Sequence, residues 1–487
     1  MSTDVAAHAA ENPVFGVEQH GIDYIPEDQR KMTLRQLADF WIGVSLYPFN
    51  FVIGPLAYSL GLPLWQTLLI IAAGTILGYL AVGYGGIAGP RSGVPTHIVG
   101  RAAFGVRFNS VNSLMAWLVG IVYEIVNVAT GTFAALALFD QIGWKDSGDA
   151  GKVLGIVLVY LTSVIVSFLG HGTLIYVQRF FAAFLGIATV LVLLFLLPNL
   201  DLSAGLGHPD LTWFAAAAIA MGIVIAGSGT YVIDAADFSR YLPKDTAGSK
   251  IAGVQAWAAS GATLLLAFTG AIAASQTKAD VIADPFTTMK PLVDQPIIYV
   301  LFLLAAIGGA ISNNALTLYS AALAAQAVGL PLKRAQAVLV DAAIATVGIA
   351  VVIFGSGSYL ANLNNLVVFA VVWAFPYGAI WIYDAFKRNW HIDPVAAHGG
   401  SESPYYGSGG AKPGAVIALL AGVLMAFLSI NVPKYHGPIS DAFDGADLSW
   451  FVGPLVAIVL YVILRPIMDR DTGVLADTKT PAGAVAK

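Results

Sequence analysis

The sequence predicts an all-α integral membrane protein with about twelve transmembrane helices. Of its 487 residues, 57% are hydrophobic and only 11% are charged, and the mean hydropathy is +0.76. Soluble globular proteins carry about 25% charged residues, so this composition excludes a water-soluble enzyme. Runs such as LGIATVLVLLFLL, at residues 185–197, are apolar on every side, whereas the strands of an outer-membrane barrel alternate.

Twelve apolar segments are each long enough to cross a bilayer, which takes about 20 residues. They lie at residues 38–60, 64–88, 110–139, 152–170, 173–197, 213–236, 252–275, 297–328, 336–354, 362–385, 413–431 and 450–468. With the N-terminus inside, most of the 24 Lys and Arg residues fall on the inner face. Because basic residues favour that side, we expect a multi-pass protein of the plasma or inner membrane with both termini cytoplasmic.

The spans divide the chain into a core and two added helices. A cytoplasmic tail covers residues 1–36, and a ten-helix core covers 37–390, with halves at about 37–197 and 213–390. Residues 391–412 are rich in Gly, Ser and Pro, which predicts a flexible loop. Two further transmembrane helices at 413–468 and a cytoplasmic tail at 469–487 complete the chain.

Composition and motifs exclude several functions. The net charge of −5 is small and dispersed, which argues against nucleic-acid binding, and the absence of cysteine excludes disulfides and thiolate metal sites. No catalytic motif is present, so we expect neither an enzyme nor a bound cofactor. Asp234 and Asp237 resemble a carboxylate pair, but we expect them to form ion pairs with Arg240 at the inner end of the sixth span.

Two spans contain residues that interrupt helices. The first has Pro48 and Asn50 in its middle, and proline removes a backbone donor, so we expect a break near residues 47–51. At a similar depth the sixth span contains Gly227, Ser228 and Gly229. The two interruptions are five spans apart. Because five is an odd number, the second half of the chain crosses the membrane in the opposite direction to the first half. Paired broken helices mark the midplane site of transporters, although Gly and Pro are also commoner in membrane helices generally.

The third span has polar residues on one face. Tyr123 and Asn127 are four residues apart and stack on one helical face, and Glu124 adjoins that face. An ionisable residue in a span indicates function, because burying an unpaired carboxylate costs several kcal/mol. The alternatives are an ion pair between Glu124 and an inner-face arginine, and a packing role for the Tyr123 ring.

Amides also occur in the fifth and eighth spans. Gln178 can donate and accept hydrogen bonds, which suits the edge of a heterocycle, but a helix–helix hydrogen bond is an equal alternative. Ser312, Asn313 and Asn314 are consecutive, and packing explains such a cluster poorly.

Five segments together resemble the nucleobase:cation symporter-1 family of cytosine, purine, hydantoin and allantoin permeases. They are GPRSGVPTHIVGRAAFGVRFNS (89–110), YEIVN (123–127), HGTLIYVQR (171–179), AADFSRYLP (235–243) and SNNALTLYS (312–320). The resemblance implies a leucine-transporter-like fold of two inverted five-helix repeats plus two extra helices. It also implies a substrate held between the first, third, sixth and eighth spans.

The resemblance assigns substrate-binding roles. Tyr123 occupies the position of a family Trp that stacks on the substrate ring, and Asn127 occupies an amide-bearing position one turn later. Gln178 occupies a position where fungal members have Glu. Ser228 occupies a position where other members have a second aromatic residue, so the substrate ring would have an aromatic side chain on one face only. Asn313 and Asn314 resemble amides that read the ring edge, and Asn50 and Gly227 adjoin the site at the two interrupted helices.

The coupling ion is a proton or sodium. The family's sodium site uses carbonyls of the first span, here near Pro48 and Phe49, with two neighbouring hydroxyls of the eighth. Here the pair is Ile311 and Ser312, so one hydroxyl is missing. Proton coupling is therefore at least as well supported as sodium coupling. Glu124 is the candidate proton carrier.

These observations predict a secondary active transporter that imports a nucleobase, cytosine or a purine, by cation symport. The same fold could instead carry allantoin, hydantoin, uracil or a vitamin such as thiamine. A channel or a membrane-embedded enzyme is disfavoured, since broken helices and few ionisable residues are typical of a carrier. The expected partners are a small heterocycle and the lipid bilayer, without nucleic acid, and the oligomeric state is open.

Overall fold

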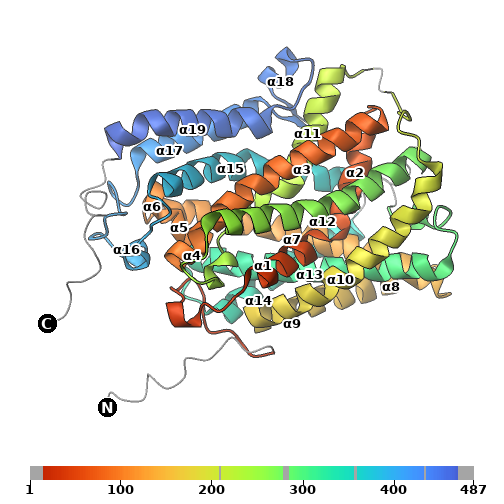
Figure 1. Ribbon diagram of the computed structural model, residues 1–487, viewed down its shortest axis with the longest axis horizontal. Helices are drawn as coiled ribbons and strands as arrows, with labels where there is room; N and C mark the ends of the chain where they lie inside the picture. Colours follow the sequence, from red (N-terminus) through yellow and green to blue (C-terminus); the bar gives the residue numbers. More distant parts are fainter. Residues whose placement is uncertain (1–14, 208–209, 278–284, 356–358, 433–434, 470–487) are drawn as a thin grey trace.

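Each of the twelve predicted spans is helical in the computed structural model, which describes residues 15–207, 210–277, 285–355, 359–432 and 435–469 (Figure 1). The first half comprises α1 (Leu34–Ser45), α2 (Pro48–Tyr58), α3 (Leu64–Gly86), α7 (Phe108–Gln141), α8 (Gly148–Ile156), the π-helix η2 (Val157–Leu161), α9 (Thr162–Leu169) and α10 (His171–Leu196). The second comprises α11 (Trp213–Gly229), the 3-10 helix η4 (Thr230–Ile233), α12 (Gly248–Thr277), α13 (Pro296–Val328), α14 (Arg334–Phe354) and α15 (Tyr359–Lys387). The two last spans are α17 (Pro413–Leu428) and α19 (Ser449–Met468).

Short elements join these helices. They are η1 (Glu27–Gln29), α4 (Ala88–Ser92), α5 (Thr96–Val99), α6 (Arg101–Phe104), η3 (Leu197–Asn199), η5 (Ser239–Tyr241), η7 (Thr287–Met289), α16 (Pro394–His398), β1 (Asn431–Val432), β2 (Tyr435–His436) and α18 (Pro438–Ala442). The two strands form an antiparallel pair. Among the described residues, nine helices are long and apolar enough to cross a membrane, or ten when α1 and α2 count as one span.

Corresponding helices of the two halves pack against each other. The pairs are α2 with α11, α3 with α12, and α7 with α13. The last pair joins the two longest helices of the described chain, of 34 and 33 residues, and forms the most extensive interface. This pairing places the first, third, sixth and eighth spans around one centre.

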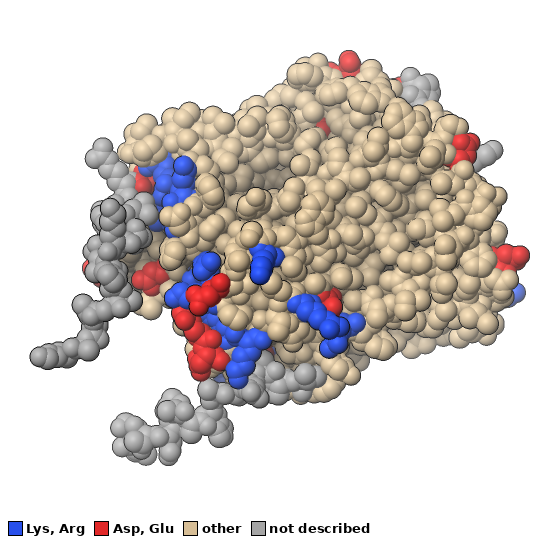
Figure 2. Space-filling view, in the orientation of Figure 1, with Lys and Arg blue, Asp and Glu red and all other residues tan. Residues whose placement is uncertain are grey.

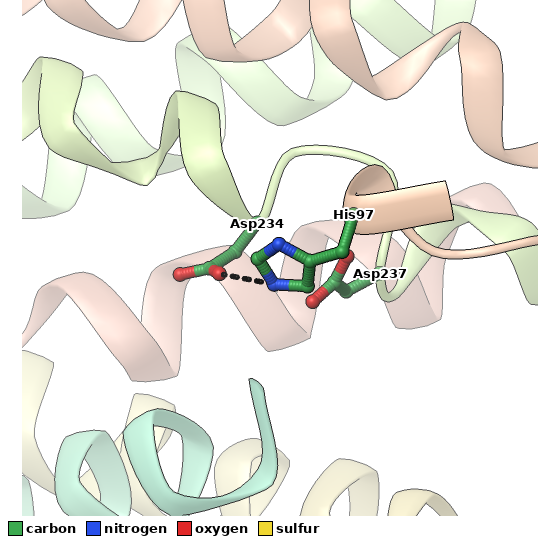
Figure 3. Close-up of side chains that lie close together, drawn as sticks. All are labelled: His97, Asp234 and Asp237. Carbon is green, nitrogen blue, oxygen red and sulfur yellow. Dashed lines mark ion pairs between the residues drawn. The ribbon is translucent and has the colours of Figure 1, made fainter. Parts of the chain in front are cut away.

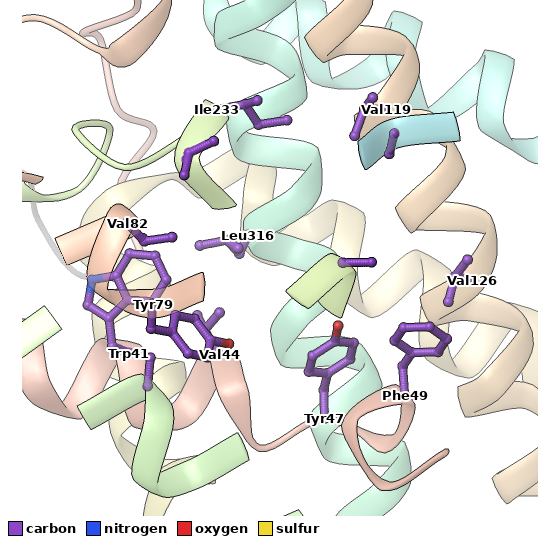
Figure 4. Packing of buried hydrophobic residues seen from close by; sticks show 14 of the residues in the cluster. Trp41, Val44, Tyr47, Phe49, Tyr79, Val82, Val119, Val126, Ile233 and Leu316 are labelled. Carbon is purple, nitrogen blue, oxygen red and sulfur yellow. The ribbon is translucent and has the colours of Figure 1, made fainter. Parts of the chain in front are cut away.

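The break in the first span is where the sequence predicts it. α1 ends at Ser45, α2 begins at Pro48, and their axes differ by 56°. The Asn50 amide donates to the Ser45 carbonyl over 2.7 Å, which satisfies an acceptor that the interrupted helix leaves free. Tyr47 and Phe49 flank the turn with ring centroids 6.2 Å apart (Figure 4).

The sixth span differs from the prediction. α11 continues through Gly227 and Ser228 to Gly229 and then changes to the 3-10 helix η4, and the bend there does not exceed 40°. These glycines serve close packing instead, because a Cβ on Gly227 would lie 2.3 Å from Ile53 Cδ1 and one on Gly229 3.0 Å from Phe375 Cζ. The change of helix type comes one residue after the predicted interruption.

The two C-terminal helices are tied to the core through Asp384 on α15. Its carboxylate accepts from Tyr461 over 2.8 Å and pairs with Arg388 at 2.6 Å and Arg465 at 3.2 Å. The segment predicted as a flexible loop contains α16 and hydrogen-bonds to the core, since Lys412 Nζ donates to the Ala102 carbonyl over 2.8 Å.

The long side of the molecule is apolar. In Figure 2 most of its visible area is neither basic nor acidic, and the Lys and Arg side chains gather towards the end where Figure 1 places α4, α6 and α16. Large apolar side chains such as Leu69, Ile187 and Val347 are more than half exposed. Such a surface is stable in lipid rather than in water.

The N-terminal segment closes one end of the bundle through Glu18. Its carboxylate accepts from the His171 backbone N–H over 2.8 Å and from Tyr319 over 3.2 Å, and it lies 3.5 Å from Arg334. Burial favours the neutral acid, but the charges of Arg334 and Arg240 outweigh it and hold the pKa of Glu18 below its usual value. Glu18 is therefore ionised at neutral pH, and its contribution is lost only as the pH falls through that lowered pKa.

We expect Glu18→Gln to loosen this closure, because breaking a buried ion pair costs about 3–5 kcal/mol. The chain has no cysteine, so a single Ser320→Cys beside the central cavity supplies a unique thiol for labelling. Faster labelling with Glu18→Gln is the expected result. Glu27→Gln, which removes an exposed pair with Lys244, should leave the rate unchanged. Equal rates for the two variants would show that Glu18 does not hold this end closed.

Candidate substrate site

A small cavity lies where α7, η4 and α13 meet. Its lining includes Tyr123, Thr230, Tyr231, Asp234, Asn313 and Thr317. Its free volume is about 30 Å³, which holds two or three water molecules but no nucleobase ring. A ring substrate can therefore enter only if the surrounding helices move apart, as the helices of an alternating-access carrier do.

Two tyrosines present rings to this cavity. The Tyr123 hydroxyl donates to the Ala226 carbonyl over 3.2 Å, which anchors the ring of α7 against α11. Tyr231 on η4 stacks on Tyr79 with centroids 6.2 Å apart and meets the edge of Trp41 at 5.7 Å. Figure 4 shows Trp41 and Tyr79 packed together beside the broken first span.

Tyr231 corrects the expectation for the sixth span. Ser228 was the expected position of a second aromatic, but its hydroxyl hydrogen-bonds to the Val224 and Gly74 carbonyls and so faces α3. The second aromatic of the cavity comes three residues later, after the helix has changed type. The sequence signal for it was an aromatic residue directly after the Gly-Ser-Gly-Thr run.

An amide network joins four helices behind the rings. Asn127 on α7 donates to Asn313 Oδ1 over 2.8 Å. The Asn313 amide donates in turn to the Val44 carbonyl over 2.8 Å and to the Tyr231 hydroxyl over 2.7 Å. The Oδ1 atom of Asn127 is buried and has no partner among the described residues. Because buried acceptors are rarely left unpaired, this oxygen is available to a polar ligand.

Gln178 and Ser312 bond to each other and do not line the cavity. The Ser312 hydroxyl donates to Gln178 Oε1, and the Gln178 amide donates to the Ser312 carbonyl over 2.9 Å. This pair joins α10 to α13. Gln178 therefore forms the helix–helix hydrogen bond that was expected from the sequence as the alternative to substrate binding. A Cβ on Gly43 would lie 2.6 Å from the Gln178 carbonyl, so α1 presses on the same pair.

Three other predicted site residues lie outside the cavity lining. Asn314 is fully buried, and neither of its amide atoms has a partner in the described chain. Asn50 donates to Thr263 Oγ1 over 3.1 Å as well as to Ser45, so it holds the helix break. Gly227 faces Ile53 on α2.

The residues at the break fit a sodium ion poorly. Pro48 and Phe49 offer backbone carbonyls, but of the two α13 residues Ser312 alone offers a side-chain oxygen, because Ile311 has an apolar side chain. Gly309 lies directly opposite, where a Cβ would come within 2.5 Å of the Leu46 carbonyl. α13 therefore packs closely against the break. It offers a cation one side-chain oxygen, that of Ser312.

Glu124 is fully buried but lies away from the Tyr123 cavity. Its Oε2 accepts from Tyr160 over 3.3 Å, and its carboxyl group is within hydrogen-bonding reach of Asp341 on α14. The expected alternative, an ion pair with an arginine of the inner face, is not found for Glu124 among the described residues. Sequence reasoning missed Asp341, although it falls within the predicted span 336–354.

A second polar cluster borders the cavity. His97, Asp234 and Asp237 place one ligand atom each within 4.8 Å of the others, and His97 lies between the two carboxylates (Figure 3). Asp234 pairs with His97 at 3.9 Å, and Asp237 accepts from the Thr96 N–H over 2.9 Å. The expected ion pairs with Arg240 do not form, because Arg240 turns towards Gly21 and Tyr319.

This cluster could hold a cation. Burial lowers the pKa of His97, which favours the neutral, metal-binding form of the ring. Both ring nitrogens lack hydrogen-bond partners among the described residues.

A larger hollow on the described surface is not the candidate site. It has a volume of about 730 Å³ between α3, α11, α15 and α19, and it is lined by apolar side chains such as Leu77, Phe375 and Trp450. Its walls include residues of the lipid-facing exterior. It offers no set of donors and acceptors for a polar ring.

Comparison with known proteins identifies the family. The family model described as permease for cytosine/purines, uracil, thiamine, allantoin matches residues 24–453. A candidate purine-cytosine permease of Bacillus subtilis, YxlA, is 24% identical over 94% of this chain and 98% of its own length. The allantoin permease of Bacillus subtilis is 23% identical over 91% of this chain and 93% of its own length.

The fold is that of a solved transporter. Mhp1, a nucleobase-cation-symport-1 family transporter in a closed conformation with bromovinylhydantoin bound, superposes with a TM-score of 0.71. The match covers 92% of this chain and 94% of Mhp1 at 18% identity. The inverted five-helix repeat expected from the sequence is thereby confirmed. This chain is an integral, multi-pass membrane protein that belongs to the family of permeases for cytosine/purines, uracil, thiamine and allantoin.

Proposed function

We propose that the chain imports a nucleobase or a closely related planar heterocycle by cation symport. The observation that supports this most directly is one cavity bounded by the Tyr123 and Tyr231 rings and by the Asn313 amide. A flat ring can stack on the tyrosines while its edge bonds to amides. A site built to hydrogen-bond such an edge strongly rejects analogues that lack it.

The substrate class follows from the polar groups at the cavity and behind it. Asn313 lines the cavity, and Asn127 behind it keeps one amide oxygen without a partner in the described chain. Asn314, outside the lining, adds two further buried atoms without such partners. Cytosine and purines carry alternating donors and acceptors on one edge and so can pair with these amides. The relatives' substrates, purines, cytosine and allantoin, share this chemistry.

The orientation in our proposal places both termini in the cytoplasm. Most basic residues of the connections lie at one end of the bundle, and basic residues favour the cytoplasmic side. Import then carries substrate towards the end of the bundle that Glu18 closes. Proton coupling is favoured over sodium because Ile311 replaces a hydroxyl of the expected sodium pattern and because Glu124 is a buried acid.

Tyr123→Ala should weaken heterocycle binding by about 1–3 kcal/mol, since a base stacked on an aromatic ring gains about that much. Tyr123→Phe keeps the ring and loses the hydroxyl contacts with the Ala226 carbonyl and Thr230, so its affinity should stay near that of the unaltered protein. The measurement is equilibrium binding of tritiated cytosine, adenine, uracil and allantoin to the purified protein.

A matched control is Tyr84→Ala, which removes a tyrosine that is half exposed on the exterior. It should bind as the unaltered protein does. If Tyr123→Phe and Tyr123→Ala lose affinity equally, the hydroxyl rather than the ring recognises substrate. If the unaltered protein binds none of the four compounds, the proposed substrate class is wrong.

A further inference from the structure

Two acidic side chains meet inside the bundle behind the substrate cavity. Glu124 on α7 and Asp341 on α14 are both fully buried, and their carboxyl groups lie within hydrogen-bonding reach of each other. α7 and α14 pack together at this point. The contact joins residues that are far apart in the sequence.

Each carboxyl group has one oxygen that accepts from a neutral donor. Trp117 Nε1 donates to Asp341 Oδ1 over 2.7 Å. The Tyr160 hydroxyl is 3.3 Å from Glu124 Oε2, and it also lies 2.8 Å from the Ala342 carbonyl, so its single proton is shared between two acceptors. Neither donor carries a charge.

The other oxygen of each carboxyl group is buried without a donor. Glu124 Oε1 and Asp341 Oδ2 have no hydrogen-bond partner among the described residues, and no ion pair with Lys, Arg or His is found there for either acid. From the elements packed around them, the titratable neighbour is Tyr160 on η2, and α13 presents Thr317 to Asn127 on α7. A proton held between the two acids would satisfy both groups.

Two carboxylates in contact at a buried site are not both ionised, because like charges repel and burial weakens the hydration of each charge. We propose that Glu124 and Asp341 form a shared-proton site that binds the coupling ion of transport. The inference rests on the proposed function, and it adds Asp341, Trp117 and Tyr160 to the coupling machinery. Loading adds one proton from water to a carboxylate oxygen, and release returns it to water on the other side of the membrane.

The location of the pair links it to the substrate site. Tyr123 precedes Glu124 directly, and Asn127 follows one turn later, so any shift of α7 relative to α14 moves both substrate contacts. Small residues let α7 pack closely against α13, as at Gly120 beside Ala321 and Gly131 beside Ala310, so a movement of α7 is felt directly by α13. An ionised pair would push α7 and α14 apart, and a shared proton draws them together.

The π-helix η2 provides the third side of the site. Tyr160 lies on this single π-helical turn, and such turns are frequent at functional sites. Three residues after Tyr160, Ser163 donates to the carbonyl of Ile311, the residue before Ser312, over 3.2 Å. The acid pair is thus connected through η2 and α9 to the part of α13 that holds the amides.

The test uses Glu124→Gln and Asp341→Asn in the full-length protein reconstituted in liposomes. An amide can donate to the opposite carboxylate and so takes the place of the shared proton. We expect each variant to keep substrate affinity within about threefold and exchange substrate by counterflow, but not to concentrate it with a proton gradient. In the unaltered protein, affinity should rise up to about tenfold per pH unit as the pH falls, because proton and substrate binding are linked.

Asp140→Asn is the matched control, since it removes a carboxylate from the end of the same helix and should leave coupling unchanged. Proton-driven accumulation by either Glu124→Gln or Asp341→Asn would overturn the proposal. A measurement that needs no variant is proton uptake on substrate binding by the unaltered protein in weak buffer, where we expect up to one proton per substrate. Binding without proton uptake at any pH between about 5.5 and 8 would also overturn it. Failure of the proposed function looks different, because the unaltered protein would then bind no compound of the panel.

Discussion

Asn313→Ala is expected to abolish concentrative uptake and to lower thermal stability. The substitution removes the hydrogen bonds to Asn127, the Val44 carbonyl and the Tyr231 hydroxyl, and each buried group left unpaired costs about 1–3 kcal/mol. Because three groups lose their partner, the expected loss of stability is about 3 kcal/mol or more. Uptake and detergent-stability measurements on the same preparation would check both parts.

The neighbouring residue supplies the contrast for this prediction. Asn314 has no partner in the described chain, so Asn314→Ala should not lower stability. If its amide meets the substrate, the variant should bind more weakly and rank purines and cytosine differently. Unchanged uptake and ranking for both variants would mean that neither amide reads the ring.

Gly270→Ala should be the most destabilising single substitution in the helix packing. A Cβ at Gly270 would lie 2.0 Å from the Phe51 carbonyl and 2.9 Å from Pro55 Cδ. On the opposing helix, a Cβ at Gly54 would lie 2.1 Å from the Ala267 carbonyl. Because the obstructing atoms belong to backbone, α2 and α12 would have to separate beside the broken first span. We expect a loss of about 3 kcal/mol or more and a clearly lower unfolding temperature.

Gly261→Ala is a matched control on the same helix. Nothing lies within 4 Å of a Cβ at Gly261, and alanine favours a helix by about 0.5–1 kcal/mol over glycine. Its unfolding temperature should equal or exceed that of the unaltered protein. Equal unfolding temperatures for Gly270→Ala and Gly261→Ala would contradict the close helix approach.

The helices and the first break could be predicted because their signals are local. Apolar runs fix the spans, and Pro48 cannot donate the hydrogen bond that a continuous helix needs. The glycines of the sixth span misled the prediction, since glycine serves both helix breaks and close packing. Only the positions of Ile53 and Phe375 decide between these uses, and a single sequence does not place them.

The site could be predicted in part. Tyr123 and Asn313 line the cavity as expected, whereas Ser228 and Gln178 bond to neighbouring helices. Tyr231 was missed because the 3-10 turn alters which residues face inward. Glu124 was recognised as a lone acid in a span, but its partner Asp341 lies six spans later. Pairing at that distance depends on tertiary structure and leaves no periodic pattern.

The most direct measurement is uptake of labelled cytosine and adenine into liposomes that contain the purified protein, with proton and sodium gradients imposed separately. The expected result is accumulation above the external concentration when protons flow inward, together with loss of that accumulation in Tyr123→Ala. Uptake that follows sodium and ignores pH from about 5.5 to 8 would contradict proton coupling. Absence of uptake under either gradient would contradict the import of a nucleobase itself.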